Sequence, residues 1–303
     1  MTTQTFSSGH SAVNLSYVPA GAQKTRGAGA NATGKRASSR PQQVRWRTVA
    51  LPVEHGGWGL TLEPVVLGLC VAPTLPGALL ALATLAAFLT RHPLKLVTGD
   101  RRRGRRFPRT PVAERFALAY ATVALVAFLL ALKTAPAVFL WPLVVAAPFA
   151  LVQLVYDALG RSRALLPELS GATALAALPA SIALAAGWAL APAFALWAVL
   201  AATRVVPSIF YVRARLRKNH GKQASIAPVL VAHLAGCALV LACVQLGLTP
   251  MLAIAAAVLL LLRAAFALSP LCPQVSAKQV GFSEIGFGLI TILTLAIGYA
   301  LKL

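Results

Sequence analysis

Acidic residues are scarce in this chain of 303 residues. It carries 28 lysines and arginines but only seven aspartates and glutamates, which gives a formal net charge of +21. The seven acids are Glu54, Glu63, Asp100, Glu114, Asp157, Glu168 and Glu284. Charged residues make up 12% of the chain, whereas soluble domains have about 25%. This shortage argues against an ordinary soluble domain.

Cysteine is sparse as well. Cys70, Cys237, Cys243 and Cys272 form no CxxC pair, and the first three lie inside apolar stretches. This pattern argues against metal or redox roles for the cysteines. We interpret the four thiols as small packing residues, and the sequence assigns neither a metal nor a cofactor.

Long apolar runs fill most of the remaining chain, which is 58% hydrophobic with a mean hydropathy of +0.75. Nine runs have lengths of roughly 15–22 residues, and most are long enough to cross a hydrocarbon core about 30 Å thick. They cover residues 57–73, 76–90, 112–132, 136–156, 169–187, 190–211, 228–246, 250–268 and 285–301. The sequence therefore predicts an all-α polytopic membrane helix bundle of about nine transmembrane helices in residues 48–303.

Basic residues alternate between the breaks that separate these runs. The segment before Trp58 contains seven, and the second, fourth, sixth and eighth breaks contain most of the others. The opposite breaks and the C-terminus contain only Lys133 and Lys302. Because Lys and Arg concentrate in cytoplasmic loops, we expect a cytoplasmic N-terminus, an outside C-terminus and location in the cytoplasmic (plasma) membrane. Anionic lipid head groups are then the expected partners of the basic loops. No nucleic-acid-reading module accompanies the charge, so we expect no nucleic acid partner.

Residues 1–47 have a different composition, rich in Ser, Gly, Ala and Thr and free of acids. We interpret them as a disordered basic cytoplasmic tail held near anionic lipid. An Arg-rich, Ser-rich, acid-poor segment is also typical of organelle transit peptides, and the sequence leaves this alternative open.

Two halves of the chain share short patterns. Glu54 precedes Pro64 by ten residues and Glu168 precedes Pro179 by eleven, and Arg91 resembles Arg204 in standing shortly before a proline. The pattern is compatible with two parallel four-helix repeats plus one extra helix. Coincidence in an Ala-, Leu- and Pro-rich chain explains it equally well.

Two ionisable residues lie deep inside apolar runs. Glu63 lies nine residues beyond Glu54, and Arg204 lies nine residues before Arg213, so both are about 13 Å from the same end of the bundle. We expect them to face one cavity and to interact as an ion pair, with a structural or a functional role. Arg263 lies nearer a helix end, where its side chain could reach the interface.

Other candidate polar residues cluster at the cytoplasmic ends of the runs. The Gly-rich entry VEHGGWG (53–59) leaves backbone N–H groups accessible at a helix N-terminus. In the segment 156–171, Asp157 and Arg161 are spaced for pairing on a helix. In the segment 211–222, paired arginines on one face have the fork geometry that suits phosphate. The full candidate set for a polar, ligand-binding cavity is Glu54, His55, Glu63, Arg91, His92, Asp157, Arg161, Arg163, Glu168, Arg204, Arg213 and Arg217.

Several of these elements together resemble the YwiC-like family of bacterial membrane proteins. They are the entry Glu54-His55-Gly56-Gly57-Trp58-Gly59 followed by Pro64 and Gly68, then Arg91-x-Pro93-Leu94, Tyr156-Asp157 with Arg161 and Arg163, and Pro167-Glu168-Leu169-x-Gly171. The resemblance runs from about residue 50 onward. It implies a multi-pass membrane fold but no particular reaction.

The predicted topology is also similar to that of UbiA-type intramembrane prenyltransferases. That resemblance implies nine helices and active-site loops after the second and sixth. Those enzymes hold Mg²⁺-pyrophosphate with Asp-rich motifs, whereas the second break here has only Asp100 and the sixth has no acid. Oxygen-ligand metal binding needs carboxylates, so that chemistry does not carry over.

Three classes of function fit these observations. We expect a cytoplasm-facing polar cavity that binds an anionic, phosphate-bearing or lipid-linked small molecule, and a transferase is one version of this. The alternatives are a transporter or permease, in which Glu63 and Arg204 relay protons or substrate, and a non-enzymatic assembly or regulatory protein.

Overall fold

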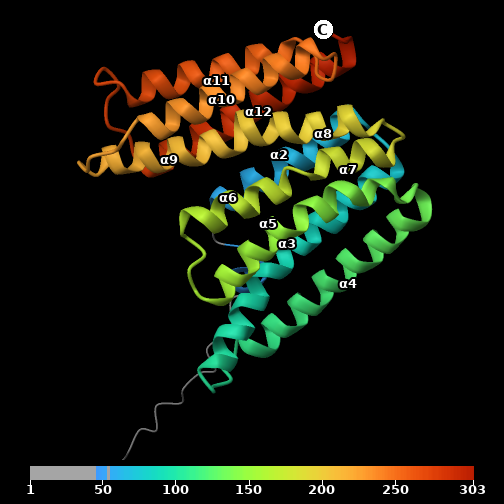
Figure 1. The fold of residues 1–303 in the computed structure, drawn as a ribbon. Coiled ribbons are helices and arrows are strands. Elements are labelled where there is room, and N and C mark those ends of the chain that lie inside the picture. Colours follow the sequence, from blue (N-terminus) through green and yellow to red (C-terminus); the bar gives the residue numbers. More distant parts are fainter. Residues whose placement is uncertain (1–45, 53–54) are drawn as a thin grey trace, which may run out of the picture. The chain divides into compact units, whose positions relative to one another are not determined.

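The computed structural model describes residues 46–52 and 55–303, with the backbone alone for 55–57. All regular structure in these residues is helical (Figure 1). Residues 1–45 of the predicted N-terminal tail and Glu54 lie outside the described residues, whereas the last two residues of that tail, 46 and 47, begin α1. The helices are α1 (Trp46–Ala50), α2 (His55–Val71), α3 (Leu75–Arg102), α4 (Thr110–Thr134), α5 (Leu140–Ala158), α6 (Leu165–Leu175), α7 (Leu178–Ala185), α8 (Leu190–Val199), α9 (Val206–Asn219), α10 (Ala227–Gln245), α11 (Leu252–Leu268) and α12 (Ala277–Leu301).

The predicted apolar runs all form helices, so the expectation of an all-α membrane protein is confirmed. Within the described residues, seven helical segments are long and apolar enough to cross a membrane. They cover Leu75–Arg102, Thr110–Thr134, Ala137–Ala158, Leu165–Ala185, Leu190–Asn219, Ala227–Gln245 and Ala277–Leu301. Two further apolar helices, Trp58–Val71 and Leu252–Leu268, are shorter. The chain is an integral multi-pass membrane protein, and the predicted count of nine crossings and the internal repeat stay predictions.

Two of the long segments are interrupted, and each interruption precedes a proline. The break at Ala176–Ala177 separates α6 from α7, which has Pro179 in its first turn. A π-helical turn, η2 (Leu200–Val205), separates α8 from α9, where Pro207 occupies the first turn. Because proline has no backbone N–H and crowds the carbonyl four residues earlier, it disrupts the regular hydrogen-bond ladder at these positions.

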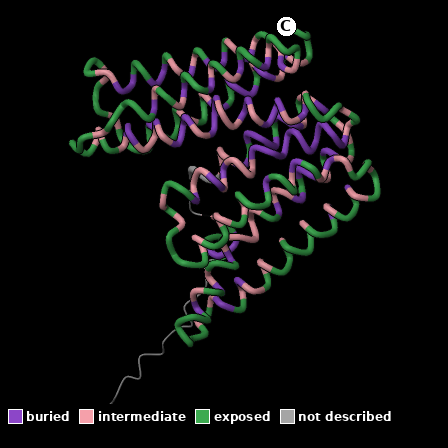
Figure 2. The backbone as a smooth tube through the Cα atoms, viewed as in Figure 1, coloured by how far each residue is buried: buried purple, intermediate pink, exposed green. Residues whose placement is uncertain are grey.

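The centre of the bundle is formed by α7 and the segment from α8 to α9. All eight residues of α7 are buried, whereas α4 is exposed along most of its length (Figure 2). A Cβ atom on Gly68 of α2 would lie 2.7 Å from the Cδ1 atom of Ile182 of α7, and one on Gly77 of α3 would lie 2.8 Å from its Cγ2 atom. Small residues therefore let both helices approach α7 closely, as expected in membranes, where packing drives association.

The connecting loops gather at two ends of the bundle (Figure 1). Asn219 donates to the Val275 carbonyl over 2.7 Å, and Arg213 donates to the Arg163 carbonyl over 3.3 Å. Arg102 donates to the Ala158 carbonyl. These bonds bring together the loops 103–109, 159–164, 220–226 and 269–276, which we call the basic end. At the other end, the Leu252 amide donates to the Leu303 carbonyl over 3.2 Å.

Candidate functional site

A cluster of charged side chains lies in the interior of the bundle. Arg204 on the π-helical turn binds both carboxylate oxygens of Glu63 of α2, with Nε–Oε2 and Nη2–Oε1 distances of 2.8 and 2.7 Å. Its Nη1 donates to Ser208 and to Glu284 of α12, and its Nη2 also donates to the Glu284 carbonyl. The predicted Glu63–Arg204 ion pair is confirmed, and 5% and 8% exposure of Arg204 and Glu63 places both in the interior.

Glu284 extends this cluster to a second arginine. One of its carboxylate oxygens accepts from Arg204 and the other accepts from Arg263 of α11. The Arg263 guanidinium lies 4.1 Å from the centre of the Tyr211 ring and 5.2 Å from that of Phe287. The suggestion that Arg263 reaches the membrane interface is therefore wrong, because its side chain is 4% exposed and held by a carboxylate and two aromatic faces.

The contacts of Arg204 favour a structural role for this cluster. A guanidinium has five N–H donors, and the five hydrogen bonds of Arg204 equal that number. The two glutamates balance the two arginines in charge, as a low-dielectric interior requires. The cluster therefore joins α2, α9, α11 and α12, and Arg204 has no donor left for a ligand.

A large cavity lies apart from this cluster. Its volume is about 1760 Å³, and α3, α5, α6 and α9 supply most of its lining. Figure 1 shows α6 between α5 and α9. Among the described residues that line the cavity, neither Glu63 nor Arg204 occurs, so this pair lies apart from the other candidates. Six candidates do line it: Arg91, Asp157, Arg163, Glu168, Arg213 and Arg217.

The cavity changes from polar to apolar along its length. On α5 its lining runs from Asp157 to Leu143, a span of roughly 20 Å for a helix. Asp157 belongs to the charged mouth at the basic end, whereas Leu143, Ala146 and Ala150 line the inner part. Such a gradient suits a molecule with one charged end and one apolar end.

One side of the cavity has an apolar rim. Leu94 of α3 and Leu154 of α5 both line it, yet they are 48% and 57% exposed. In a membrane, exposed leucines on the flank of a bundle contact lipid chains. The cavity is therefore accessible from the lipid between α3 and α5 as well as from the basic end.

At the mouth, a bidentate ion pair joins α3 to α5. Arg91 Nε and Nη2 lie 2.5 and 2.9 Å from the two carboxylate oxygens of Asp157. Gln153 also donates to Asp157 over 3.1 Å, and a Cβ on Gly171 would lie 2.6 Å from the Gln153 side-chain oxygen. Gly171 therefore lets α6 approach Gln153, which holds the Asp157 carboxylate.

The predicted pairing of Asp157 with Arg161 is wrong. Helix α5 ends at Ala158, and Gly160 adopts a positive φ of 72° that turns the chain. The Arg161 amide then donates to the Tyr156 carbonyl and the Gly160 amide to the Asp157 carbonyl, which is a Schellman C-cap. The two side chains are no longer on one helix face, and Asp157 binds Arg91 of α3 instead.

A second ion pair crosses the mouth from α6 to α9. Glu168, in the first turn of α6, accepts from Arg213 of α9. Arg213 also donates to the Arg163 carbonyl, and Lys95 of α3 donates to Ser162 over 3.1 Å. These contacts bring α3, α9 and the loop 159–164 together around one opening.

Cations outnumber carboxylates at this mouth. Of the residues that the structure describes, five cationic side chains line the cavity, against Asp157 and Glu168. Of the five, Arg91 and Arg213 are paired with carboxylates. Within the described part of the chain, Lys95, Arg163 and Arg217 form no ion pair, so a surplus of three positive charges faces the cavity.

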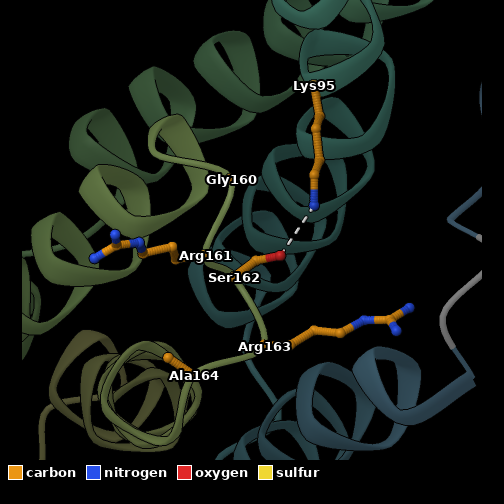
Figure 3. A pocket seen from close by; sticks show the side chains of 6 residues that line it. All are labelled: Lys95, Gly160, Arg161, Ser162, Arg163 and Ala164. Carbon is orange, nitrogen blue, oxygen red and sulfur yellow. Dashed lines mark hydrogen bonds between the residues drawn. The ribbon is translucent and has the colours of Figure 1, made fainter.

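A smaller pocket of about 430 Å³ lies on the loop next to this mouth (Figure 3). Lys95, Arg161 and Arg163 line it, but Figure 3 shows that Arg161 and Arg163 point in opposite directions from the loop. Its cations therefore do not converge on one point. Arg161 is absent from the lining of the large cavity, as far as the described residues show.

The remaining sequence candidates lie elsewhere. His92 Nε2 is 3.1 Å from the Thr48 carbonyl of α1, so it contacts α1. Glu54 lies outside the described residues, as does the side chain of His55. Sequence reasoning missed Lys95, Gln153 and Glu284 as site residues, because their roles depend on which helices become neighbours.

The arginine-rich loop between α3 and α4 is held by a buried acid. Asp100, 1% exposed, accepts from Arg109 over 2.8 Å and from the Thr110 hydroxyl over 2.8 Å. The hydrogen bond that Arg109 donates to Asp100 raises the pKa of the Arg109 guanidinium, which burial alone would lower. This contact fixes the start of α4 and is independent of the cavity.

The described residues include no group of three or more His, Cys, Asp or Glu side chains that could hold a metal ion. At the cavity, both carboxylates are already engaged by arginines. The donor set therefore fits an anion better than a cation.

Comparison with known proteins supports the resemblance drawn from the sequence. No curated protein and no solved structure matches the chain. The family model that describes YwiC-like proteins matches residues 51–183, a segment that contains Arg91, Asp157, Arg163 and Glu168. The likeness of this chain to the YwiC-like family is thereby confirmed over those residues.

Proposed function

We propose that this protein binds a lipid-like molecule with an anionic head group in the cavity between α3, α5, α6 and α9. The single observation that carries this proposal is the polarity gradient of the cavity, which has a cationic mouth and an apolar inner part. A volume of about 1760 Å³ exceeds the 300–1,000 Å³ range typical of pockets for small soluble ligands. An apolar chain would fill the excess.

We further propose nine crossings of the cytoplasmic membrane, with the N-terminus and the basic end in the cytoplasm. The alternation of basic loops and their meeting at one end support this orientation. The cavity mouth would then face the cytoplasm, so its head-group site is accessible to cytoplasmic metabolites as well as to lipid.

A transporter is the second candidate, and the buried cluster of Glu63, Arg204, Glu284 and Arg263 favours it. Ionisable residues inside membranes often mark ion pathways. The engagement of every Arg204 donor and the neutral charge balance support a fixed cross-link instead. A UbiA-like transferase has less support, because the two cavity carboxylates are bound by arginines and unavailable to Mg²⁺.

Lipid analysis of the chain purified in mild detergent tests the proposal. We expect an anionic amphiphile to be retained by the wild type and lost from Ala150→Trp, which places an indole in the inner cavity. Val144→Trp is the matched control, because Val144 lies on the same helix but faces outward with 59% exposure. Retention of the amphiphile by both variants, or its absence from both the wild type and Val144→Trp, would overturn the proposal. Ion flux in vesicles would favour the transporter.

A further inference from the structure

Among the described residues, three of the five cations that line the cavity make no ion pair. Lys95 comes from α3, Arg163 from the loop before α6, and Arg217 from α9. Membrane topology needs only basic loops, so it does not explain why cations without an ion pair come from three separate elements to line one cavity. The charge surplus therefore calls for an anionic occupant.

The surrounding contacts join the chain segments that carry these three side chains. Lys95 reaches Ser162, the residue next to Arg163. Arg213 donates to the Arg163 carbonyl, and Arg217 lies one helical turn beyond Arg213 on the same face of α9. Both cations that are paired, Arg91 and Arg213, are fixed by Asp157 and Glu168 and so form the walls of the opening.

The number of free cations distinguishes between head groups. A carboxylate carries one charge and two oxygens, which a single arginine fork satisfies. A phosphate monoester carries a charge of about −1.5 to −2 at pH 7 and three strong acceptor oxygens. Three cationic groups with donors to spare match the phosphate better. Because Asp157 and Glu168 are engaged, the described residues that line the cavity leave no unpaired carboxylate to hold a divalent cation alongside it.

We infer that the head group bound at this mouth is a phosphate ester, held by Lys95, Arg163 and Arg217 without a divalent metal. This inference rests on the proposed function and specifies its ligand class. The phosphate oxygens accept hydrogen bonds from the three side chains at the basic end. The attached apolar chain lies along Ala150, Ala146 and Leu143.

Four probes that separate head group from chain test the inference on the full-length chain in detergent. Hexadecyl phosphate, palmitate and hexadecanol share one apolar chain length, and inorganic phosphate has none. We expect hexadecyl phosphate to have the lowest Kd in native mass spectrometry titrations, with no effect of EDTA. Lys95→Gln, Arg163→Gln and Arg217→Gln should each raise that Kd about tenfold or more, the loss expected for one charge-assisted hydrogen bond.

Arg161→Gln is the matched control, because it removes the same charge from the same loop but outside the cavity lining. Its Kd should stay unchanged, and Arg163→Lys should retain part of the affinity. Gel filtration of each variant separates loss of binding from loss of folding.

The outcomes separate the inference from the proposal on which it rests. Palmitate binding as tightly as hexadecyl phosphate, or a Kd that depends on Mg²⁺, would overturn the phosphate inference and leave the amphiphile proposal intact. Inorganic phosphate binding as tightly as hexadecyl phosphate would keep the phosphate site and overturn the amphiphile proposal. If hexadecyl phosphate, palmitate and hexadecanol all fail to bind, both the phosphate inference and the amphiphile proposal are overturned.

Discussion

At the residue scale, the buried Glu63–Arg204 ion pair depends on the close approach of the α12 backbone. A Cβ atom on Gly288 of α12 would lie 2.0 Å from Oε1 of Glu63 and 2.9 Å from Nη2 of Arg204. Only glycine leaves space for the ion pair to pass against the helix backbone. A buried charge that loses its partner is costly, so this glycine protects the pair by its lack of a side chain.

This close approach makes Gly288→Ala a sensitive test of the buried cluster. We expect a loss of about 1–3 kcal/mol in unfolding free energy, the usual cost of overpacking, seen as a lower unfolding temperature in detergent. Gly286→Ala is the control, because a Cβ there meets no atom within 4 Å and alanine favours helix. If the two variants unfold at the same temperature, the tight contact between α12 and Glu63 is not present in the membrane protein.

Single residues also explain why some sequence expectations failed. The Asp157–Arg161 spacing predicts a helical pair, but Gly160 ends the helix between them. Glu63 and Arg204 were predictable because both lie at the same depth in apolar runs, and a buried charge needs an opposite one. Glu284 lies near the start of the last apolar run, so its place in the cluster depended on how far α12 extends.

At the scale of elements, α9 carries two different faces. Arg213 and Arg217 point to the cavity, whereas Arg215, 2% exposed, donates to the carbonyls of Ala267 and Pro273. Lys218 donates to the carbonyls of Leu268 and Ser269. Cations at a helix C-terminus donate to its last carbonyls and interact favourably with the negative end of the helix dipole. One face of α9 therefore caps α11, and the other face lines the cavity.

These two faces should separate stability from binding. Arg215→Met leaves buried carbonyls without donors, at about 1–3 kcal/mol for an unsatisfied group, and we expect a clearly lower unfolding temperature. Arg217→Met removes an exposed side chain and should leave that temperature nearly unchanged while weakening hexadecyl phosphate binding. The reverse pattern, with Arg217→Met unstable and Arg215→Met stable, would contradict this assignment of the faces.

The π-helical turn is another feature at this scale. A Cβ on Gly236 of α10 would lie 2.3 Å from the Ala202 carbonyl oxygen within that turn, so α10 packs directly against it. The turn places Arg204 where it reaches α2 and α12 at once. A sequence pattern with Pro207 predicts a disturbance of the helix, but not which turn widens or which side chain it directs inward.

At the scale of the whole described bundle, the helix ends group by charge. The loops at Gly104, Gly160 and Gly221 belong to the basic end, and each of these glycines has a positive φ. The turns at Gly187 and Gly247 lie in the opposite breaks and also have positive φ. Glycine at these positions allows a tight reversal between neighbouring helices.

Reporter fusions at these glycines test the proposed orientation. Fusions after Gly104, Gly160 and Gly221 should give fluorescence typical of a cytoplasmic green fluorescent protein and no alkaline phosphatase activity. Fusions after Gly187 and Gly247 should give the opposite result, since the positive-inside rule places the less basic turns outside. Opposite results for Gly104 and Gly221 would show that the proposed topology and the single cavity mouth are wrong.

The sequence by itself determined the membrane character, the helical class and the grouping of basic loops, because hydrophobic length and charge asymmetry act locally and need no tertiary information. It also indicated the Glu63–Arg204 pair, because so few acids are available to a buried arginine. Only the tertiary structure decided that Arg91 binds Asp157, that Arg213 binds Glu168, and that Lys95, Arg163 and Arg217 remain to face one cavity. These contacts depend on which helices become neighbours. The choice of neighbours depends on steric fit at glycines such as Gly171 and Gly288, and the sequence pattern alone does not show which glycines allow a close approach.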